Sequence, residues 1–181
     1  YLQDNLGAAQ EQGFTSFTGF PDLEETYSEN VLDKFAQRLM KSERSDVSDF
    51  YQFWRVDTDR LADHYYMLAQ TQAILPTDNY ELLADFNPFK GLVFVSEIAG
   101  ITRKELSVDS LKIGDVLHYE LETENIRDEK AVKLSLKDLE LGYVKSIHSR
   151  LFHKAKSRVK VKVHHVEKNG LIRRVFIEIS I

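Results

Sequence analysis

Residues 158–181 have the sequence RVKVKVHHVEKNGLIRRVFIEISI, and this stretch decides the fold class of the second half of the chain. Valine alternates with Lys and Arg at its start, which is typical of a strand with one buried and one exposed face. Asn169 and Gly170 form the strongest short-range hairpin signal in the sequence and favour a type I′ turn. Residues 171–181 supply the returning strand, so the stretch predicts an antiparallel hairpin with a basic outer face.

The segments that precede this hairpin predict further strands. Beyond Lys90 the hydrophobic period changes from about 3.6 to about 2, and β-branched residues become frequent. Five or six short strands with one helix fit a small barrel of the OB or SH3-like kind. The additional strands are expected at residues 92–97, 116–121, 131–136 and 141–144, with a turn at 113–115 and a helix at 146–155.

The first half of the chain has a helical period instead. Apolar residues recur at helical spacing over residues 31–40, 46–54 and 57–72, which predicts amphipathic helices that each bury one stripe. The aromatic residues expected in the core of these helices are Phe50, Tyr51, Phe53, Trp54, Tyr65 and Tyr66. The predicted α+β organisation has three parts: an irregular lead-in at residues 1–20, an acidic helical bundle at 21–90 and a basic β-barrel at 91–181.

Charge is unevenly distributed between the two halves. Residues 1–90 contain 7 Lys/Arg and 16 Asp/Glu, a net charge of −9, whereas residues 91–181 contain 17 and 13, a net charge of +4. A basic patch attracts polyanions, while an acidic region repels them. A solvated lysine-rich surface is the alternative interpretation. Between residues 145 and 174 the only acidic residue is Glu167, and the ten basic residues are Lys145, Arg150, Lys154, Lys156, Arg158, Lys160, Lys162, Lys168, Arg173 and Arg174.

Several functional classes are disfavoured. The chain has no cysteine, no apolar run of about 18 residues and no signal-peptide pattern, so we expect a cytoplasmic protein with no disulfide, thiolate metal site or membrane partner. His164 and His165 are expected on opposite faces of a strand, which disfavours a shared metal ion. No P-loop motif and no nucleophile–base pair is recognisable. The sequence therefore predicts no catalytic residue, metal or cofactor, and a hydrolase is the weakest alternative.

Three motifs of the second half resemble one known family. Residues 113–117 are IGDVL, residues 122–132 are ETENIRDEKAV and residues 141–144 are LGYV. In order and approximate spacing they resemble the HIRAN pattern of Gly-Asp-x-Leu, then Glu-Pro-x-Asn-x-x-Asp-x-x-Ala, then Leu-Gly-Tyr. The resemblance extends over nearly all of the second half, and the first half resembles no family that we recognise.

This resemblance implies a domain that binds nucleic acid. HIRAN domains hold the 3′ end of single-stranded DNA, and the aspartate that accepts a hydrogen bond from the terminal hydroxyl corresponds to Asp128. The residues alone also allow a structural role, because Asn125 and Asp128 can bind backbone N–H groups as Asx turns. Ser96, Glu97 and Arg127 stand where end-reading members have an Arg-Tyr pair and a Tyr, so the residues that would stack and clamp are replaced.

The resulting hypothesis is a nucleic-acid-binding module, accessory to DNA repair or processing, whose partner is single-stranded DNA or a DNA 3′ end. Tyr143, Phe94 and Phe152 are the aromatics considered for base stacking. One alternative is a protein-interaction module in which the acidic helical half docks a partner, and another has that half masking the basic barrel. The predicted nucleic-acid-binding residues are Asp128, Arg127, Tyr143, Lys145, Arg150, Arg158, Lys160 and Lys162.

Overall fold

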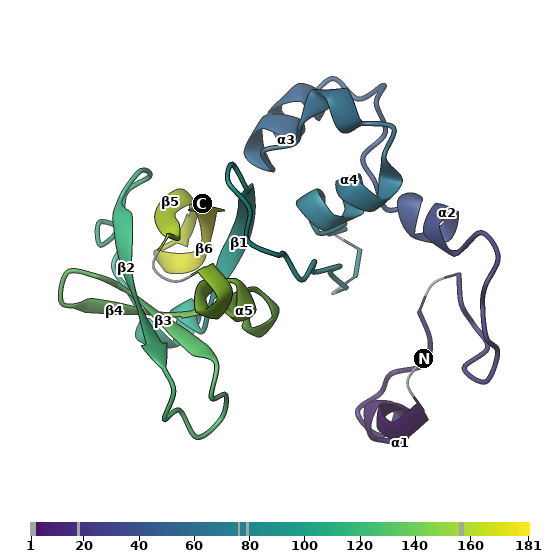
Figure 1. The fold of residues 1–181 in the computed structure, drawn as a ribbon, viewed down its shortest axis with the longest axis horizontal. Coiled ribbons are helices and arrows are strands. Elements are labelled where there is room, and N and C mark those ends of the chain that lie inside the picture. The colour runs from purple at the N-terminus through teal and green to yellow at the C-terminus, as the bar shows by residue number, and fades with distance from the viewer. Residues whose placement is uncertain (1–2, 18, 76, 79, 156–157) are drawn as a thin grey trace.

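A helical first half and a β-barrel second half make up the structure (Figure 1), which confirms the predicted α+β class. The computed structural model describes residues 3–17, 19–75, 77–78, 80–155 and 158–181, so Lys156 of the basic segment lies outside the described residues. No helix in these residues is long and apolar enough to cross a membrane. The helices are α1 (Gln3–Glu11), α2 (Val31–Ala36), α3 (Val47–Phe53), α4 (His64–Thr71) and α5 (Ser146–Ala155), with 3-10 helices η1 (Thr58–Arg60) and η2 (Ile101–Lys104). The strands are β1 (Val93–Ala99), β2 (Val116–Glu122), β3 (Ala131–Leu136), β4 (Leu139–Val144), β5 (Lys160–Asn169) and β6 (Leu171–Ser180).

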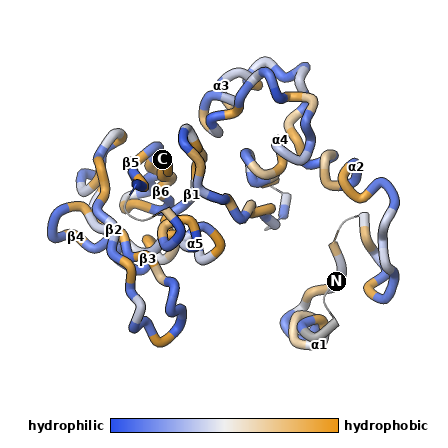
Figure 2. The backbone as a smooth tube through the Cα atoms, in the orientation of Figure 1, coloured by the Kyte–Doolittle hydropathy of each residue, from blue (hydrophilic) through white to orange (hydrophobic). Residues whose placement is uncertain are grey.

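The six strands close into an antiparallel barrel in the order β1-β4-β3-β2-β5-β6. Each predicted strand overlaps an observed one, and α5 begins and ends where the sequence predicts a helix. All six strands send apolar side chains into one core, which Leu151 and Phe152 of α5 join. Figure 2 shows hydrophilic and hydrophobic stretches succeeding one another along the strands, as expected when only one face of a strand is buried in the core.

The hairpin between β5 and β6 forms as predicted, but its turn differs. Asn169 pairs directly with Leu171, so Gly170 alone stands at the tip, with a φ of 69°. A type I′ turn needs a positive φ at both central residues, and Asn169 does not have one. The predicted turn type is therefore wrong, whereas the predicted hairpin is confirmed.

An irregularity in β5 changes the expected placement of its two histidines. The register of β5 against β6 shifts between Val163 and His165. The rings of His164 and His165 both lie against Phe53, with centroid distances of 4.9 and 5.8 Å. The prediction that the two histidines face opposite sides is therefore wrong, because a bulge interrupts the alternation on which it depends.

The barrel closes where β4 meets β1 at Gly142. The two strands pair only at Ile98 with Val144 and at Ala99 with Tyr143. Gly142 has a φ of 143°, and a Cβ atom there would collide with the carbonyl oxygen of Ala99 and lie 3.0 Å from Cγ2 of Ile98. The glycine of the LGYV motif therefore permits a close approach of two backbones.

The helices of the first half are shorter than their periodicity predicts. The segment 57–72 splits into η1 and α4, because Asp63 caps a second helix by accepting a hydrogen bond from the Tyr66 N–H at 2.9 Å. In the segment 31–40 the helix ends at Ala36, and Leu32 on the predicted buried stripe is 42% exposed. Helix α1 occupies part of the predicted irregular lead-in, so that prediction is wrong there.

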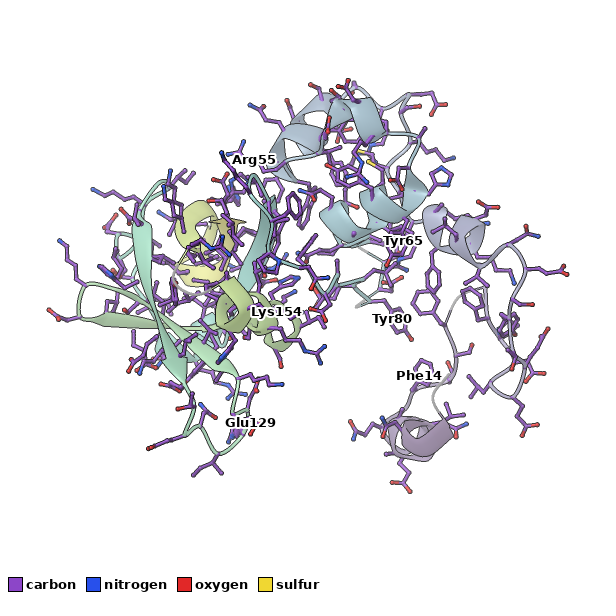
Figure 3. The ribbon with its side chains drawn as sticks, in the orientation of Figure 1. Phe14, Arg55, Tyr65, Tyr80, Glu129 and Lys154 are labelled. Carbon is purple, nitrogen blue, oxygen red and sulfur yellow. The ribbon has the colours of Figure 1, made fainter. Side chains whose placement is uncertain are left out.

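Aromatic residues of the helical half pack on the outside of the barrel. Trp54, which directly follows α3, is buried in one cluster with Val95 of β1 and Phe176 of β6. The Trp54 and Phe176 rings meet edge to face with centroids 6.2 Å apart. Tyr65 on α4, in contrast, is 75% exposed (Figure 3). The prediction that these aromatic residues form the core of the helical half is therefore partly wrong, because Tyr65 is exposed and Trp54 is buried against the barrel.

Two glutamines also fasten the helical half to β1. The Gln70 Nε2 donates to the Val93 carbonyl at 3.1 Å, and the Gln72 Nε2 donates to the Val95 carbonyl at 2.8 Å. Strand β4 pairs with β1 only at the final residues of β1, Ile98 and Ala99, so the carbonyls of Val93 and Val95 lie outside that pairing. Both glutamines are buried, and their hydrogen bonds satisfy backbone groups that would otherwise be costly to bury.

Candidate nucleic-acid interface

The predicted binding residues lie in three places on the barrel. The loop after β2 leaves the strand at Glu122, whereas Lys162 of β5 pairs with Val116 at the strand's other end. The seven residues of β2 separate the two positions by about 20 Å. The three groups are Arg127, Asp128 and Tyr143 around this loop, Lys145 and Arg150 at α5, and Arg158, Lys160 and Lys162 at β5.

Strand β5 presents a basic row to solvent. Lys160 and Lys162 are exposed, and Val161 between them is buried. Within the described part of the chain, neither lysine has an acidic group within salt-bridge distance. Glu178 lies opposite Lys162 on β6, but its carboxylate binds Arg55 at 2.7 Å. The two lysines therefore keep their charges available to a ligand.

Arg158 lies between α5 and this row. Its Nε donates to the Ala155 carbonyl at 3.1 Å, which satisfies an acceptor at the end of the helix. The residue is exposed. A guanidinium has five N–H donors, so donors remain for a second acceptor.

Lys145, directly before α5, and Arg150 on α5 are paired with the helical half of the chain. Residues 80–90 run past α5 without regular secondary structure until they approach β1, and we call them the acidic strap. Lys145 forms an ion pair with Glu81, and the Arg150 Nη1 lies 3.0 Å from the Asp85 Oδ2. These two predicted binding residues thus already have anionic partners, in contrast to the lysines of β5.

The loop between β2 and β3 is built on two Asx turns. The Asn125 Oδ1 accepts hydrogen bonds from the N–H groups of Arg127 at 3.0 Å and Asp128 at 3.3 Å. The Asp128 Oδ1 accepts from the N–H of Lys130 at 2.9 Å. The structural role expected of Asn125 and Asp128 is therefore confirmed.

The second carboxylate oxygen of Asp128 faces the start of α5. The Asp128 Oδ2 accepts from the Ser146 hydroxyl at 2.9 Å. The hydrogen bonds from the Lys130 N–H and from Ser146 lower the pKa of Asp128, so the carboxylate is ionised at neutral pH. A carboxylate can accept about four hydrogen bonds in total. Asp128 can therefore accept one from a ligand hydroxyl without losing its loop contacts.

Tyr143 belongs to the same network through Glu122. The Tyr143 hydroxyl donates to the Glu122 Oε2 at 3.1 Å, and Asn125 donates to the same oxygen at 2.8 Å. Lys133 lies 2.7 Å from the other oxygen and lowers the pKa of Glu122 most strongly. Glu122 therefore joins Tyr143 on β4 to the loop that carries Asp128.

Other residues considered for base recognition have structural roles. Phe94 and Phe152 are each 1% exposed, so the expectation that they could stack on bases is wrong. Ser96 is fully buried. Glu97 binds Arg174 through both carboxylate oxygens, at 3.0 and 2.9 Å. Ser96 is therefore inaccessible to a ligand, and the carboxylate of Glu97 is occupied by Arg174.

The loop also carries an exposed apolar residue that our sequence reasoning missed. Ile126 lies between Asn125 and Arg127, and its relative exposure is 103%. Figure 3 shows that this loop, in which Glu129 is labelled, extends away from the helical half. Ile126 is the only apolar residue among positions 122–130. This isolation in a polar loop is the feature of the sequence from which the exposure of Ile126 could have been predicted, because an apolar side chain there has no core to enter.

Comparisons with known proteins are sparse for this chain. No protein-family model and no curated protein matches the sequence. Among solved structures, the HIRAN domain of human HLTF is similar with a TM-score of 0.38 and 12% sequence identity, over 48% of this chain and 74% of that one. A protein from Lactobacillus plantarum is similar with a TM-score of 0.38 and 15% identity, over 51% of this chain and 96% of that one.

Proposed function

We propose that the barrel is a nucleic-acid-binding module for single-stranded DNA and that Lys160 and Lys162 contact its phosphates. The observation that carries this proposal is the basic row of β5, in which both lysines are exposed and have no acidic partner in the described residues. Lysines that neutralise phosphates release condensed counterions, which favours binding and makes it salt-dependent. Arg158 extends the row toward α5.

The loop of Asp128 is the proposed position of the strand's 3′ end. Its ionised carboxylate can accept a hydrogen bond from a terminal hydroxyl and would repel a terminal phosphate. Tyr143, which Glu122 joins to this loop, and the exposed Ile126 offer apolar surface for a base. Because β2 separates this loop from Lys162, only an oligonucleotide that spans the length of the strand can reach both positions.

The role that follows is one of binding, with no catalytic step assigned to the chain. The motifs of the second half resemble those of HIRAN domains, which supports a ligand of single-stranded DNA. A module of this kind would hold a DNA end for another protein, and we infer an accessory role in DNA repair or processing.

Fluorescence anisotropy with a labelled single-stranded oligothymidylate tests the phosphate contacts. We expect the double variant Lys160→Glu, Lys162→Glu to bind more weakly and the slope of log K against log[salt] to become shallower by about 1.4, because two contacts are lost. The matched control is Lys137→Glu, Lys168→Glu, which changes the net charge equally at two other exposed lysines. Equal losses in both double variants, or no binding by the unmodified chain at low salt, would contradict the proposal.

A further inference from the structure

The acidic strap places its oxygen atoms against every Lys and Arg of α5 and the residue before it. The strap and the helix run in the same chain direction, so successive strap residues meet successive helix residues. Figure 3 shows Lys154 on the side of α5 that faces the strap. The three contacts are Lys145 with Glu81, Arg150 with Asp85 at 3.0 Å and Lys154 with the side-chain oxygen of Asn87 at 3.0 Å.

Side chains, and not a shared ladder of backbone hydrogen bonds, hold the strap in place. Residues 80–89 form neither helix nor strand. Within the described chain, the amides of residues 83–90 donate no hydrogen bond to another backbone group. The main apolar anchor is Phe86, whose ring stacks on Phe94 at a centroid distance of 4.2 Å. The strap can therefore leave α5 without breaking a helix or a sheet.

We propose that the acidic strap occupies part of the nucleic-acid surface and that single-stranded DNA displaces it. This inference rests on the proposed function, because it assigns a second set of cations to the same ligand. The carboxylates of Glu81 and Asp85 hold positions beside cations that phosphates would take, and like charges cannot share them. Displacement of the strap adds Lys145, Arg150 and Lys154 to the basic row of β5.

Neutralising the strap while keeping its shape tests the proposal. In the full chain, Glu81→Gln with Asp85→Asn removes two negative charges but leaves side chains of nearly the same size. We expect this variant to bind the labelled oligothymidylate at least about fivefold more tightly, with a salt slope steeper by about 1.4 for two freed cations. Glu29→Gln with Glu43→Gln is the matched control, because it changes the net charge equally at exposed residues away from α5.

A second measurement follows the strap directly. Hydroxyl-radical oxidation of the Phe86 side chain in the unmodified chain, followed by mass spectrometry, should increase when the oligonucleotide is added, because the ring leaves its stacked position on Phe94. Unchanged or reduced oxidation of Phe86, or equal affinities of the strap variant and its charge-matched control, would overturn the inference. These outcomes do not depend on the β5 test. If Lys160→Glu, Lys162→Glu loses binding and the strap variant does not gain any, only the proposal that the strap masks the surface is contradicted. If the strap variant binds more tightly and the β5 variant loses no affinity, only the assignment of phosphate contacts to Lys160 and Lys162 is contradicted.

Discussion

The Nδ1 atom of His148 on α5 lies 2.8 Å from the Oγ atom of Ser96 on β1. Both residues are buried, at 2% and 0% exposure. The rings of Phe86 and Phe94 pack beside the imidazole, with centroids 5.9 and 5.0 Å away. Burial, together with the nearby charge of Lys145, lowers the pKa of His148 to about 4. The histidine is therefore a neutral hydrogen-bonding member of the barrel interior at physiological pH.

The buried imidazole makes stability depend on pH. In the unfolded chain His148 takes up a proton below about pH 6.5, whereas in the folded chain it does so only below about pH 4. Acidification therefore favours the unfolded state, and stability present above pH 6.5 is lost as the pH falls toward 4. At about pH 4.5 the loss from this one residue amounts to about 2.5 kcal/mol.

Urea unfolding of the unmodified chain and of His148→Gln at about pH 7.5 and about pH 4.5 measures this contribution. Glutamine does not titrate in this range and has an amide that can bond to Ser96. We expect the unmodified chain to lose about 2.5 kcal/mol more than the variant over this interval. Equal losses would show that His148 is not held neutral by burial.

Substitution of Gly142 tests the close approach that closes the barrel. Gly142→Ala places a methyl group against the Ala99 carbonyl and forces β4 away from β1. We expect a loss of at least about 2 kcal/mol in the free energy of unfolding. Gly170→Ala is the matched control, because its φ is also positive but nothing lies within 4 Å of the added Cβ. That variant should lose only about 1 to 2 kcal/mol from its left-handed conformation, and equal losses in the two would argue against a collision at Gly142.

Local patterns predict the barrel well because strands and helices impose their own short periods. The alternation that begins β5 and the helical period of α5 are both properties of neighbouring residues. In β6, however, Val175, Phe176 and Ile177 are buried in succession. Alternation alone would leave Phe176 exposed, and its contacts with Phe53 and Trp54, far away in the sequence, bury it. Burial on the outer face of the barrel therefore could not be predicted from the strand itself.

The candidate interface is predicted less completely for the same reason. The Asx turns of Asn125 and Asp128 are local and could be predicted. The pairing of Lys145 with Glu81 and of Arg150 with Asp85 joins residues more than 60 positions apart. The asymmetry of charge between the halves is compatible with such pairing but does not say which cations it engages. Among the described cations, the structure shows which ones are paired. Lys145 and Arg150 have acidic partners, whereas Lys160 and Lys162 have none in the described part of the chain.

Trp54 provides a test of how strongly the helical half is packed on the barrel. Trp54→Ala removes a buried indole from its contacts with Val95 and Phe176. We expect the free energy of unfolding, measured with urea, to fall by about 3 to 5 kcal/mol. Tyr65→Ala removes a comparably large aromatic side chain that is 75% exposed and should change stability by no more than about 0.5 kcal/mol. A small effect of Trp54→Ala would mean that the helices contribute little to the stability of the barrel.

Asp128 provides the test of end recognition, because its carboxylate distinguishes a hydroxyl from a phosphate. We expect the unmodified chain to bind an oligonucleotide with a 3′-hydroxyl about tenfold more tightly than the same oligonucleotide with a 3′-phosphate, as a charge-assisted hydrogen bond implies. Asp128→Asn keeps an oxygen for the Lys130 N–H and a polar group beside Ser146, so the loop should keep its shape while the preference falls to within about twofold.

The control for this substitution is Asp138→Asn, which removes the same charge at an exposed position between β3 and β4. It should leave the preference for the 3′-hydroxyl intact. If Asp128→Asn and Asp138→Asn both keep the preference, the carboxylate of Asp128 serves only the loop. If the unmodified chain binds both oligonucleotides equally while the β5 variant still loses affinity, the barrel holds single strands by their phosphates and does not read the end.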